Sequence, residues 1–328
     1  PRGGGRGPRG DGPRAARHQQ PAGGKITVLG ALRDLTGVVK LIRHHPLLAT
    51  AAERRSAYGR FLAWQLAGRA HAGALSMDFV NGTQLLVKRR LGGRLHYVLG
   101  LAEFDDMAFV AHILRPGEVF ADVGANIGAY TLMAAACAGA NVVAFEPAER
   151  ARRYLGDNVA LNGLQSKVEI RAEAVGASSG RLELTAGMGE VNHVRLEGEH
   201  TETVQADMVS LDGFFAGRRL AVIKVDVEGF ETEVMRGATR LLAARAPLAL
   251  LIELAGLGAR YGYDEEKVRA ELDKHGYVAC MYQGMTRKLS PVTTRDDPGS
   301  NALYVRDLHE AQERLRSAPP FLLNGRRI

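Results

Sequence analysis

The chain has little cysteine and no long apolar run. Its only cysteines, Cys137 and Cys280, lie far apart within apolar stretches of the 328 residues. Two isolated cysteines provide neither a disulfide framework nor a metal-ligand cluster, so we expect buried thiols in a reducing, cytoplasmic compartment. The nearest approach to a membrane span, 241–254, contains Arg245 and Glu253 and is too short to cross a bilayer. The N-terminus has no apolar core behind its basic residues, so we expect no signal peptide.

An excess of basic charge is also absent from most of the chain. The net charge of +7 arises from residues 1–60, which contain 12 Lys and Arg against 3 Asp and Glu. The remaining residues carry 31 basic and 33 acidic side chains and are nearly neutral. A nucleic-acid enzyme usually concentrates basic charge on the body that holds its substrate. The distribution therefore argues against a nucleic-acid partner.

The front of the chain divides into two regions. Residues 1–24 are mostly Gly, Pro and Arg, and we expect them to be disordered. Residues 25–96 form a second region, in which apolar spacings of three and four over 27–74 predict helices and an Asn-Gly pair within 78–90 predicts a small hairpin. We expect this helical attachment to pack against the main domain. Because its helix is basic, a peripheral membrane or protein contact stays open.

A regular alternation of strands and helices begins near residue 97. We expect strands near 118–123, 141–146, 167–172, 220–226, 247–254, 277–282 and 301–306. We expect helices near 103–114, 127–138, 149–162, 229–243 and 263–275. This order predicts an α/β, doubly wound, mostly parallel seven-stranded sheet with helices on both faces, over residues 97–310. Residues 177–215 read as a β-rich insertion and 311–328 as a C-terminal tail.

The stretch VFADVGANIGAYTL (119–132) leads from a strand through glycines into a helix. A dinucleotide loop would read G-x-G-x-x-G and direct helix amides at a pyrophosphate. Here a carboxylate, Asp122, precedes the first glycine, where it would repel phosphate but attract an ammonium group. The next strand ends in Glu146, about 20 residues later, a position suited to ribose hydroxyls. A nucleoside with an amino-acid head and no phosphate fits both carboxylates, and S-adenosylmethionine has that form. We predict that Asp122 faces its ammonium group, directly or through water.

Three segments together resemble the FkbM family of S-adenosylmethionine-dependent methyltransferases. They are VFADVGANIGAYTL, VVAFEPAERARRYLGDNVALNGL and LAVIKVDVEGFETEVMRGA, and the resemblance covers about residues 97–306. It implies a class I, Rossmann-like methyltransferase fold with S-adenosyl-L-methionine as cofactor. It also implies O-methylation of a hydroxyl on a sugar, polyketide, lipid or other natural-product acceptor. The family often has a glutamate where Glu103 stands, although a helix-start charge explains that residue equally well.

The cofactor-binding residues that we predict lie in the glycine loop and at four strand ends. They are Asp122, Gly124, Ala125, Asn126, Gly128, Glu146, Pro147, Glu173, Ala174 and Asp226. Glu173 and Ala174 end the third strand and are expected to border the adenine. Solvent exposure is the alternative for Glu173, since acids at strand ends are commonly exposed.

The fourth strand, AVIKVDVEGFE (221–231), carries the predicted catalytic residues. Asp226 reaches its carboxyl end, beside the glycine loop, and is our preferred base or base-positioning group, with Glu228 second. Lys224 falls on the same face of the strand, either as a functional group or as a buried partner of Asp226. We read Glu231 as a charge at the start of the next helix.

Two histidines and a metal remain open alternatives at this site. His193 and His200, in the insertion, could also act as bases. The acids of the fourth strand could bind Mg²⁺, but the resemblance does not require a metal, and we predict none.

Two other functions stay open. The same fold could methylate an amine, which has less need of a base. Alternatively, the chain could be a catalytically silent cofactor-binding module. The joint presence of Asp122, Glu146 and Asp226 argues against silence, because a silent module need not keep all three.

Overall fold

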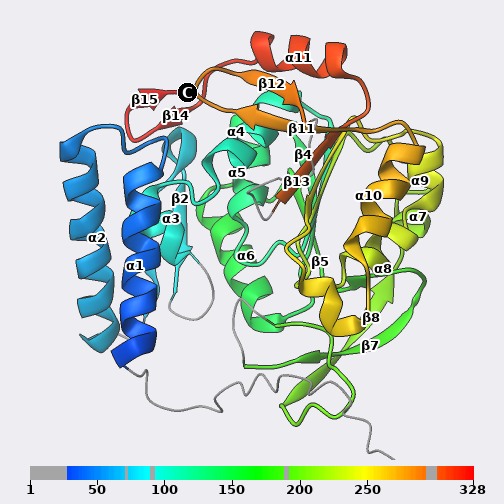
Figure 1. Ribbon diagram of the computed structural model, residues 1–328, viewed down its shortest axis with the longest axis horizontal. Coiled ribbons are helices and arrows are strands. Elements are labelled where there is room, and N and C mark those ends of the chain that lie inside the picture. The colour runs from blue at the N-terminus through cyan, green and yellow to red at the C-terminus, as the bar shows by residue number, and fades with distance from the viewer. Residues whose placement is uncertain (1–27, 71–72, 89–92, 188–191, 293–300) are drawn as a thin grey trace, which may run out of the picture. The chain divides into compact units, whose positions relative to one another are not determined.

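The computed structural model describes residues 28–70, 73–88, 93–187, 192–292 and 301–328 (Figure 1). The chain divides into two units, with the boundary between Leu41 and Ile42. Most of helix α1 (Val28–His44) belongs to the first unit. All other described elements belong to the second. The disorder expected for residues 1–24 concerns residues outside the described ranges. No helix within these ranges has both the length and the apolarity to cross a membrane.

An eight-stranded sheet forms the centre of the second unit (Figure 1). Its strands, in spatial order, are β12 (Lys288–Pro291), β11 (Val278–Gln283), β13 (Asn301–Val305), β10 (Ala249–Glu253), β9 (Val222–Val225), β3 (Val119–Val123), β4 (Asn141–Phe145) and β5 (Val168–Arg171). Neighbours from β5 to β10 pair in parallel, whereas β13 runs antiparallel to both β10 and β11. The predicted mostly parallel sheet is confirmed.

The sheet has one strand more than the seven predicted. The additional strand, β12, pairs antiparallel with β11 and forms a hairpin with it. Its segment follows Arg287, which has a φ of 54°, and one of its four residues is a proline. In the sequence, this mixture of polar, turn and proline residues reads as a loop rather than a strand.

The inner strands are buried on both faces because helices cover both sides of the sheet (Figure 1). One layer consists of α4 (Phe104–Ile113), α5 (Ala129–Cys137), α6 (Glu149–Leu161) and α11 (Leu308–Ser317). The other consists of α7 (Leu211–Phe214), α8 (Glu231–Arg236), α9 (Thr239–Ala243) and α10 (Glu265–Lys274). Alternation along β3 places Phe120 in the first core and Ala121 and Val123 in the second. Asp122 therefore points toward the layer that contains α5.

The predicted hairpin lies before this sheet. Strands β1 (Leu75–Asp78) and β2 (Gln84–Val87) pair antiparallel around a turn that contains Asn81 and Gly82, both with positive φ. The side-chain amide of Asn158, in α6, bonds the backbone of β2 as a neighbouring strand would. Its Oδ1 accepts a hydrogen bond from the Leu86 amide at 2.6 Å, and its Nδ2 donates to the Leu86 carbonyl at 3.2 Å. Asn162, which follows α6, bonds the Gln84 backbone in the same way, so two amide side chains attach the hairpin to the main domain.

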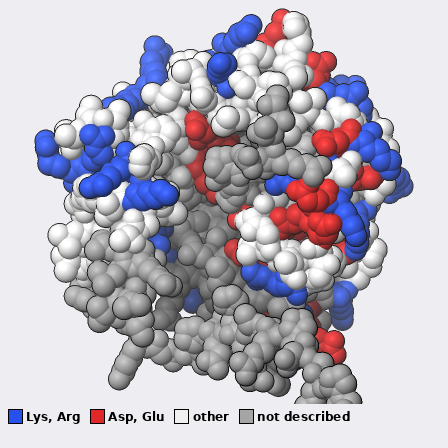
Figure 2. Space-filling view, in the orientation of Figure 1, with Lys and Arg blue, Asp and Glu red and all other residues white. Residues whose placement is uncertain are grey.

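Helices precede and follow this hairpin. Helix α2 (Ala51–Ala70) lies against α3 (Arg94–Leu99), and the Arg60 guanidinium donates to the Val98 carbonyl at 3.0 Å (Nε). Helix α4 confirms the helix predicted at 103–114. In the right part of Figure 2, around α8 to α10, basic and acidic side chains are interspersed, in agreement with the near-neutral body.

The helix predicted over 229–243 is two helices, α8 and α9. A Cβ added at Gly237, between them, would lie 2.1 Å from the Gly176 carbonyl oxygen. Asp212 then caps the second helix, since its carboxylate accepts from the amides of Arg240 at 2.8 Å and Leu241 at 2.9 Å. The break therefore results from a close backbone approach and a cap from a distant residue.

The insertion over 177–215 is β-rich, as predicted. Strands β7 (Gly180–Thr185) and β8 (Thr203–Val209) pair antiparallel and form a small sheet with β6 (Ala174–Val175). The region expected to be a C-terminal tail contains most of α11, which starts two residues before 310, and the strands β14 (Leu322–Leu323) and β15 (Arg326–Arg327).

Candidate active site

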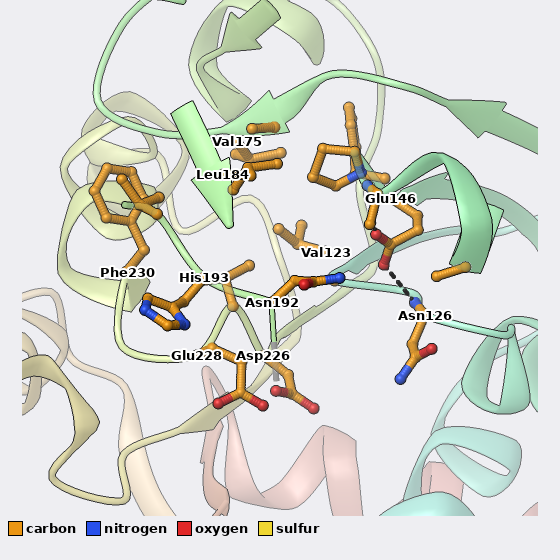
Figure 3. A pocket seen from close by; sticks show the side chains of 18 of the residues that line it. Val123, Asn126, Glu146, Val175, Leu184, Asn192, His193, Asp226, Glu228 and Phe230 are labelled. Carbon is orange, nitrogen blue, oxygen red and sulfur yellow. Dashed lines mark hydrogen bonds between the residues drawn. The ribbon is translucent and has the colours of Figure 1, made fainter. Parts of the chain in front are cut away.

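A cleft of about 370 Å³ lies at the carboxyl ends of β3, β4 and β9 (Figure 3). This is the edge at which doubly wound sheets bind ligands. Most of the predicted site residues line it: Gly124, Asn126, Glu146, Pro147, Glu173, Ala174, Asp226 and Glu228. Asp122, Ala125, Gly128 and Lys224 are not among the lining residues. In Figure 3, Glu146 and Asn126 lie on one side of the cleft, and His193 and Phe230 on the other.

Gly124 joins the two strand ends that form the floor of the cleft. Its φ is 81°, and an added Cβ would lie 1.8 Å from the Asp226 carbonyl oxygen. The turn after β9 therefore passes directly against the glycine loop, an approach that no side chain permits. The glycine is needed for this contact between two chain segments, in addition to any approach of a ligand.

Glu146 holds the glycine loop to the end of β4. Its Oε2 accepts a hydrogen bond from the Asn126 amide at 2.8 Å, and its Oε1 accepts from the Ala148 amide at 2.8 Å (Figure 3 shows the first). Burial raises the pKa of Glu146 to about 7, although these two amide bonds oppose the shift. Each oxygen retains a lone pair, so the carboxylate can also accept from ligand hydroxyls.

Asp122 lies beneath the loop and is 1% exposed. Its Oδ2 accepts from the Thr131 hydroxyl at 2.6 Å, while its Oδ1 is buried and has no hydrogen-bond partner in the described part of the chain. Burial raises the pKa of Asp122, and the positive charge of Lys224 opposes that shift. The structure thus places Asp122 behind the cleft wall.

Lys224 is the buried cation of the site, with 3% exposure. Its Nζ donates to Asp226 Oδ2 at 3.0 Å and lies 4.8 Å from the centre of the Tyr130 ring. Burial acts to lower the pKa of Lys224, but the charges of Asp226, Asp122 and Glu103 outweigh it and raise the pKa. Lys224 is therefore a buried partner of Asp226, and its ammonium group faces one Asp226 oxygen.

Two further acids shape the turn after β9. Glu231 Oε1 accepts from the amides of Val227 at 3.0 Å and Gly229 at 3.1 Å, so it stabilises the turn, much as the sequence suggested for a helix-start charge. Glu228 has a φ of 57°, unusual for a residue with a side chain. This conformation places Glu228 in the cleft beside Asp226 (Figure 3).

The insertion supplies one side of the cleft. His193 lines it, and its Nε2 lies 3.3 Å from Glu199 Oε2. His200 is exposed and is not among the lining residues. Tyr261 ties the insertion to the domain, because its hydroxyl donates to the Val194 carbonyl at 2.9 Å. The structure thus brings only the first of the two candidate histidines to the site.

Several lining residues were missed by the sequence analysis, most importantly Glu253 and Phe230. Glu253 ends a buried strand, as Glu146 does, and that shared pattern was a signal that could have identified it. Phe230 had no such signal. It belongs to an aromatic cluster with Tyr261 and Tyr263, at centroid distances of 5.8 Å and 6.5 Å, from segments distant in sequence.

The lining of the cleft is acidic. It contains the carboxylates of Glu146, Glu173, Asp226, Glu228 and Glu253, and none of its described residues is Lys or Arg. A phosphorylated ligand would meet repulsion here, whereas a cationic or neutral ligand would not. Within the ranges that the structure covers, no group of His, Cys, Asp and Glu is arranged to hold a metal ion.

Comparisons with known proteins point to one family. Residues 122–279 match the family model described as the methyltransferase FkbM domain. No curated protein matched the sequence.

Solved structures with some likeness include three methyltransferases. A precorrin-6y C5,15-methyltransferase from Geobacter metallireducens is 12% identical, with a TM-score of 0.35, covering 62% of this chain and 86% of that one. An rRNA methylase from Streptococcus thermophilus is 14% identical, with a TM-score of 0.32, covering 61% and 93%. A SAM-dependent O-methyltransferase from Thermotoga maritima is 13% identical, with a TM-score of 0.32, covering 61% and 63%.

Proposed function

We propose that the protein, whose residues 122–279 match the model of the methyltransferase FkbM domain, transfers a methyl group from S-adenosylmethionine to a hydroxyl oxygen of a small-molecule, lipid or glycan-like acceptor. The observation that carries the proposal is the acidic cleft. It brings the glycine loop, Glu146 and Asp226 to one cavity that has no Lys or Arg in its described lining.

The residues present fit this cofactor. Bound there, S-adenosylmethionine supplies an electrophilic methyl group on a positively charged sulfur. Glu146 is placed to accept from ribose hydroxyls, because it lines the cleft and backbone amides fix both of its oxygens, one from Asn126 of the loop and one from Ala148. Asp122 contributes negative charge beneath the same loop, and its unpartnered Oδ1 suits a contact through water with an ammonium group.

Asp226 is the base in this proposal. It lines the cleft, and its side chain is 33% exposed. The hydrogen bond from Lys224 goes to Oδ2 of Asp226. The second oxygen is therefore available to accept the proton that an acceptor hydroxyl loses when its oxygen gains the methyl group. Holding the acceptor oxygen in line with the methyl–sulfur bond provides much of the remaining rate enhancement.

The first test is cofactor binding, measured by calorimetry with S-adenosylmethionine and with NAD. We expect binding of the former and none of the latter. Replacement Glu146→Ala should weaken that binding, whereas Glu271→Ala, on the exposed surface of α10, should leave it unchanged. Preference for NAD, or no binding of either, would contradict the proposal.

The second test separates oxygen from nitrogen acceptors. Asp226→Asn should lower kcat for a hydroxyl acceptor by about 10²–10⁴-fold, the usual contribution of a positioned base. An amine acceptor needs less help with proton removal, so a much smaller loss would indicate N-methylation. Binding of cofactor without methylation of any acceptor in a broad screen would favour a silent binding module.

A further inference from the structure

Glu253 stands beside Asp226 because of the sheet register. Strand β10 pairs in parallel with β9, and Ile252 is opposite Val225. The next residue on each strand is an acid, so two carboxyl groups leave adjacent strands at the same level. Both line the cleft. Asp226 and Glu253 are 27 residues apart in the sequence. Their proximity follows from the pairing of the two strands and cannot be read from either segment by itself.

The surroundings of Glu253 disfavour its ionised form. Its Oε2 is buried and has no hydrogen-bond partner in the described part of the chain. An ionised carboxylate in that position would lack the donors it requires. The charged groups that face it are Asp226, Glu228 and Glu231, all of them acidic. Burial, followed by the charges of Asp226 and Glu228, raises the pKa of Glu253 to about 9.

Asp226 has the opposite surroundings. The buried ammonium of Lys224 donates to Asp226 Oδ2 at 3.0 Å, whereas the charged groups that face Glu253 include no cation. The carboxyl groups of Glu253 and Asp226 leave adjacent strands at the same level, so they are neighbours in the cleft. A hydrogen bond between two carboxyl groups requires a proton on one of them. Because the cation lies against Asp226, the proton belongs on Glu253.

We propose that Glu253 is protonated at neutral pH and donates to Asp226, so that the two strand-end acids work as one proton-sharing pair facing the acceptor. In this role Glu253 is a positioning residue. It orients the Asp226 carboxylate, whose Oδ2 is held by Lys224, and leaves a lone pair on the second oxygen for the acceptor proton.

The catalytic consequence rests on the proposed function. During transfer the acceptor oxygen forms its bond to carbon, the carbon–sulfur bond breaks, and the acceptor proton passes to Asp226. Protonated Glu253 adds no negative charge to the cleft during this step. The pair therefore suits an acceptor that arrives neutral, with its hydroxyl proton still attached.

A titration tests the proton on Glu253 directly and needs no acceptor. The full-length protein is labelled with carbon-13 at the glutamate side-chain carboxyls, and each resonance is followed from pH 4 to pH 10 by NMR. We expect one resonance with a midpoint near 9 in the wild type. That resonance should be missing in Glu253→Gln and retained in the matched control Glu271→Gln, which instead loses a resonance whose pKa lies below the usual value.

Two further titrations distinguish a proton shared by Glu253 and Asp226 from an isolated acid and from a bound cation. In Asp226→Asn the Glu253 midpoint should fall by at least about one pH unit, because the adjacent negative charge is gone. In the wild type, millimolar Mg²⁺ should leave the resonance unchanged. A Glu253 midpoint near 4.5, or loss of the high midpoint on addition of Mg²⁺, would overturn the proposal, the second by showing that a cation holds the two carboxylates together.

This titration also keeps the two proposals distinguishable. Failure to bind S-adenosylmethionine would remove the methyltransferase function, yet leave a midpoint near 9 intact. Normal cofactor binding together with an ordinary Glu253 midpoint would remove the proton-sharing pair alone.

Discussion

Glu146 and Glu253 end two strands of the same sheet and line the same cleft, but they have opposite partners. After β4 the chain turns into α6, and two backbone amides point at Glu146. After β10 the neighbouring strand presents Asp226 to Glu253. Burial raises the pKa of both, to about 7 and about 9. The comparison teaches that burial alone does not decide the charge of an acid at a strand end, because the groups that neighbouring segments direct at the acid also decide it.

The largest expected effect comes from disrupting the contact between the glycine loop and the turn after β9. Gly124→Ala would place a Cβ 1.8 Å from the Asp226 carbonyl at a φ of 81°. The cost of the left-handed conformation and of overpacking together is about 3 kcal/mol or more of unfolding free energy. Chemical denaturation measures this loss, and calorimetry should show cofactor binding lost with it.

The matched control is Gly156→Ala in α6, where an added Cβ meets nothing within 4 Å. It should stabilise the protein by roughly 0.5–1 kcal/mol, because alanine is the better helix former. Equal stability of the two variants would show that the contact between Gly124 and Asp226 does not exist in solution.

The next effect isolates Glu253 through the pH dependence of stability. The folded protein retains the Glu253 proton up to about pH 9, whereas the unfolded chain releases it near 4.5. Its stabilising contribution is therefore complete below pH 4.5 and is lost as the pH rises to 9. Glu253→Gln lacks this loss, so its unfolding free energy relative to wild type should rise by about 1.4 kcal/mol or more between pH 5 and 9. This free energy is equivalent to a shift of one pKa unit. It is smaller than the full shift would give, because solvent at the cleft screens the charges. A difference independent of pH would contradict it.

The effect of Glu146 should appear in ligand binding. It should grow as the pH falls, whereas the effect of Glu253 on stability grows as the pH rises. In the proposed complex the ribose hydroxyls donate to the ionised carboxylate of Glu146, which is present above pH 7 and is lost as the pH falls below it. The Kd for S-adenosylmethionine should therefore rise below pH 7, by at most about tenfold per pH unit. Calorimetry on wild type and Glu146→Gln checks this, since the variant should bind more weakly and with a flat profile over the same range.

The smallest effect is expected at Glu173, a third strand-end acid in the cleft. It is half-buried, and although burial opposes the shift, hydrogen bonds from Arg171 and from backbone amides lower its pKa. Glu173→Gln should change the unfolding free energy by no more than about 0.5 kcal/mol, as for most exposed ion pairs. A loss as large as that of Gly124→Ala would mean that the end of the cleft lined by Glu173 is not open to solvent.

Local patterns predicted much of the fold. Continuous apolar segments such as VVAF and AVIKV identified the buried strands, and the Asn-Gly pair identified the hairpin. The errors arose where a distant residue intervened. Gly237 contacts Gly176 and splits the predicted helix, and β12 forms by pairing with β11.

The residues of the candidate site likewise fall into those that local sequence patterns identify and those that depend on distant contacts. Glu146, Asp226 and the glycine loop could be identified because each lies at a strand-to-helix transition with a recognisable spacing. Phe230 had no signal in the sequence, because its place depends on the aromatic cluster. The position of Glu253 at a strand end was readable, but its pairing with Asp226 depends on the register between β9 and β10.

The sequence by itself determined which strands are buried and which acids stand at their carboxyl ends, because hydrophobic pattern and strand-end chemistry are local properties of the chain. Only the tertiary structure decided that Asp122 lies behind the cleft wall while Glu253 lines it. Side-chain exposure depends on which helices cover a strand, and a carboxyl proton depends on which charges arrive from neighbouring strands. Both are set by contacts between residues far apart along the chain.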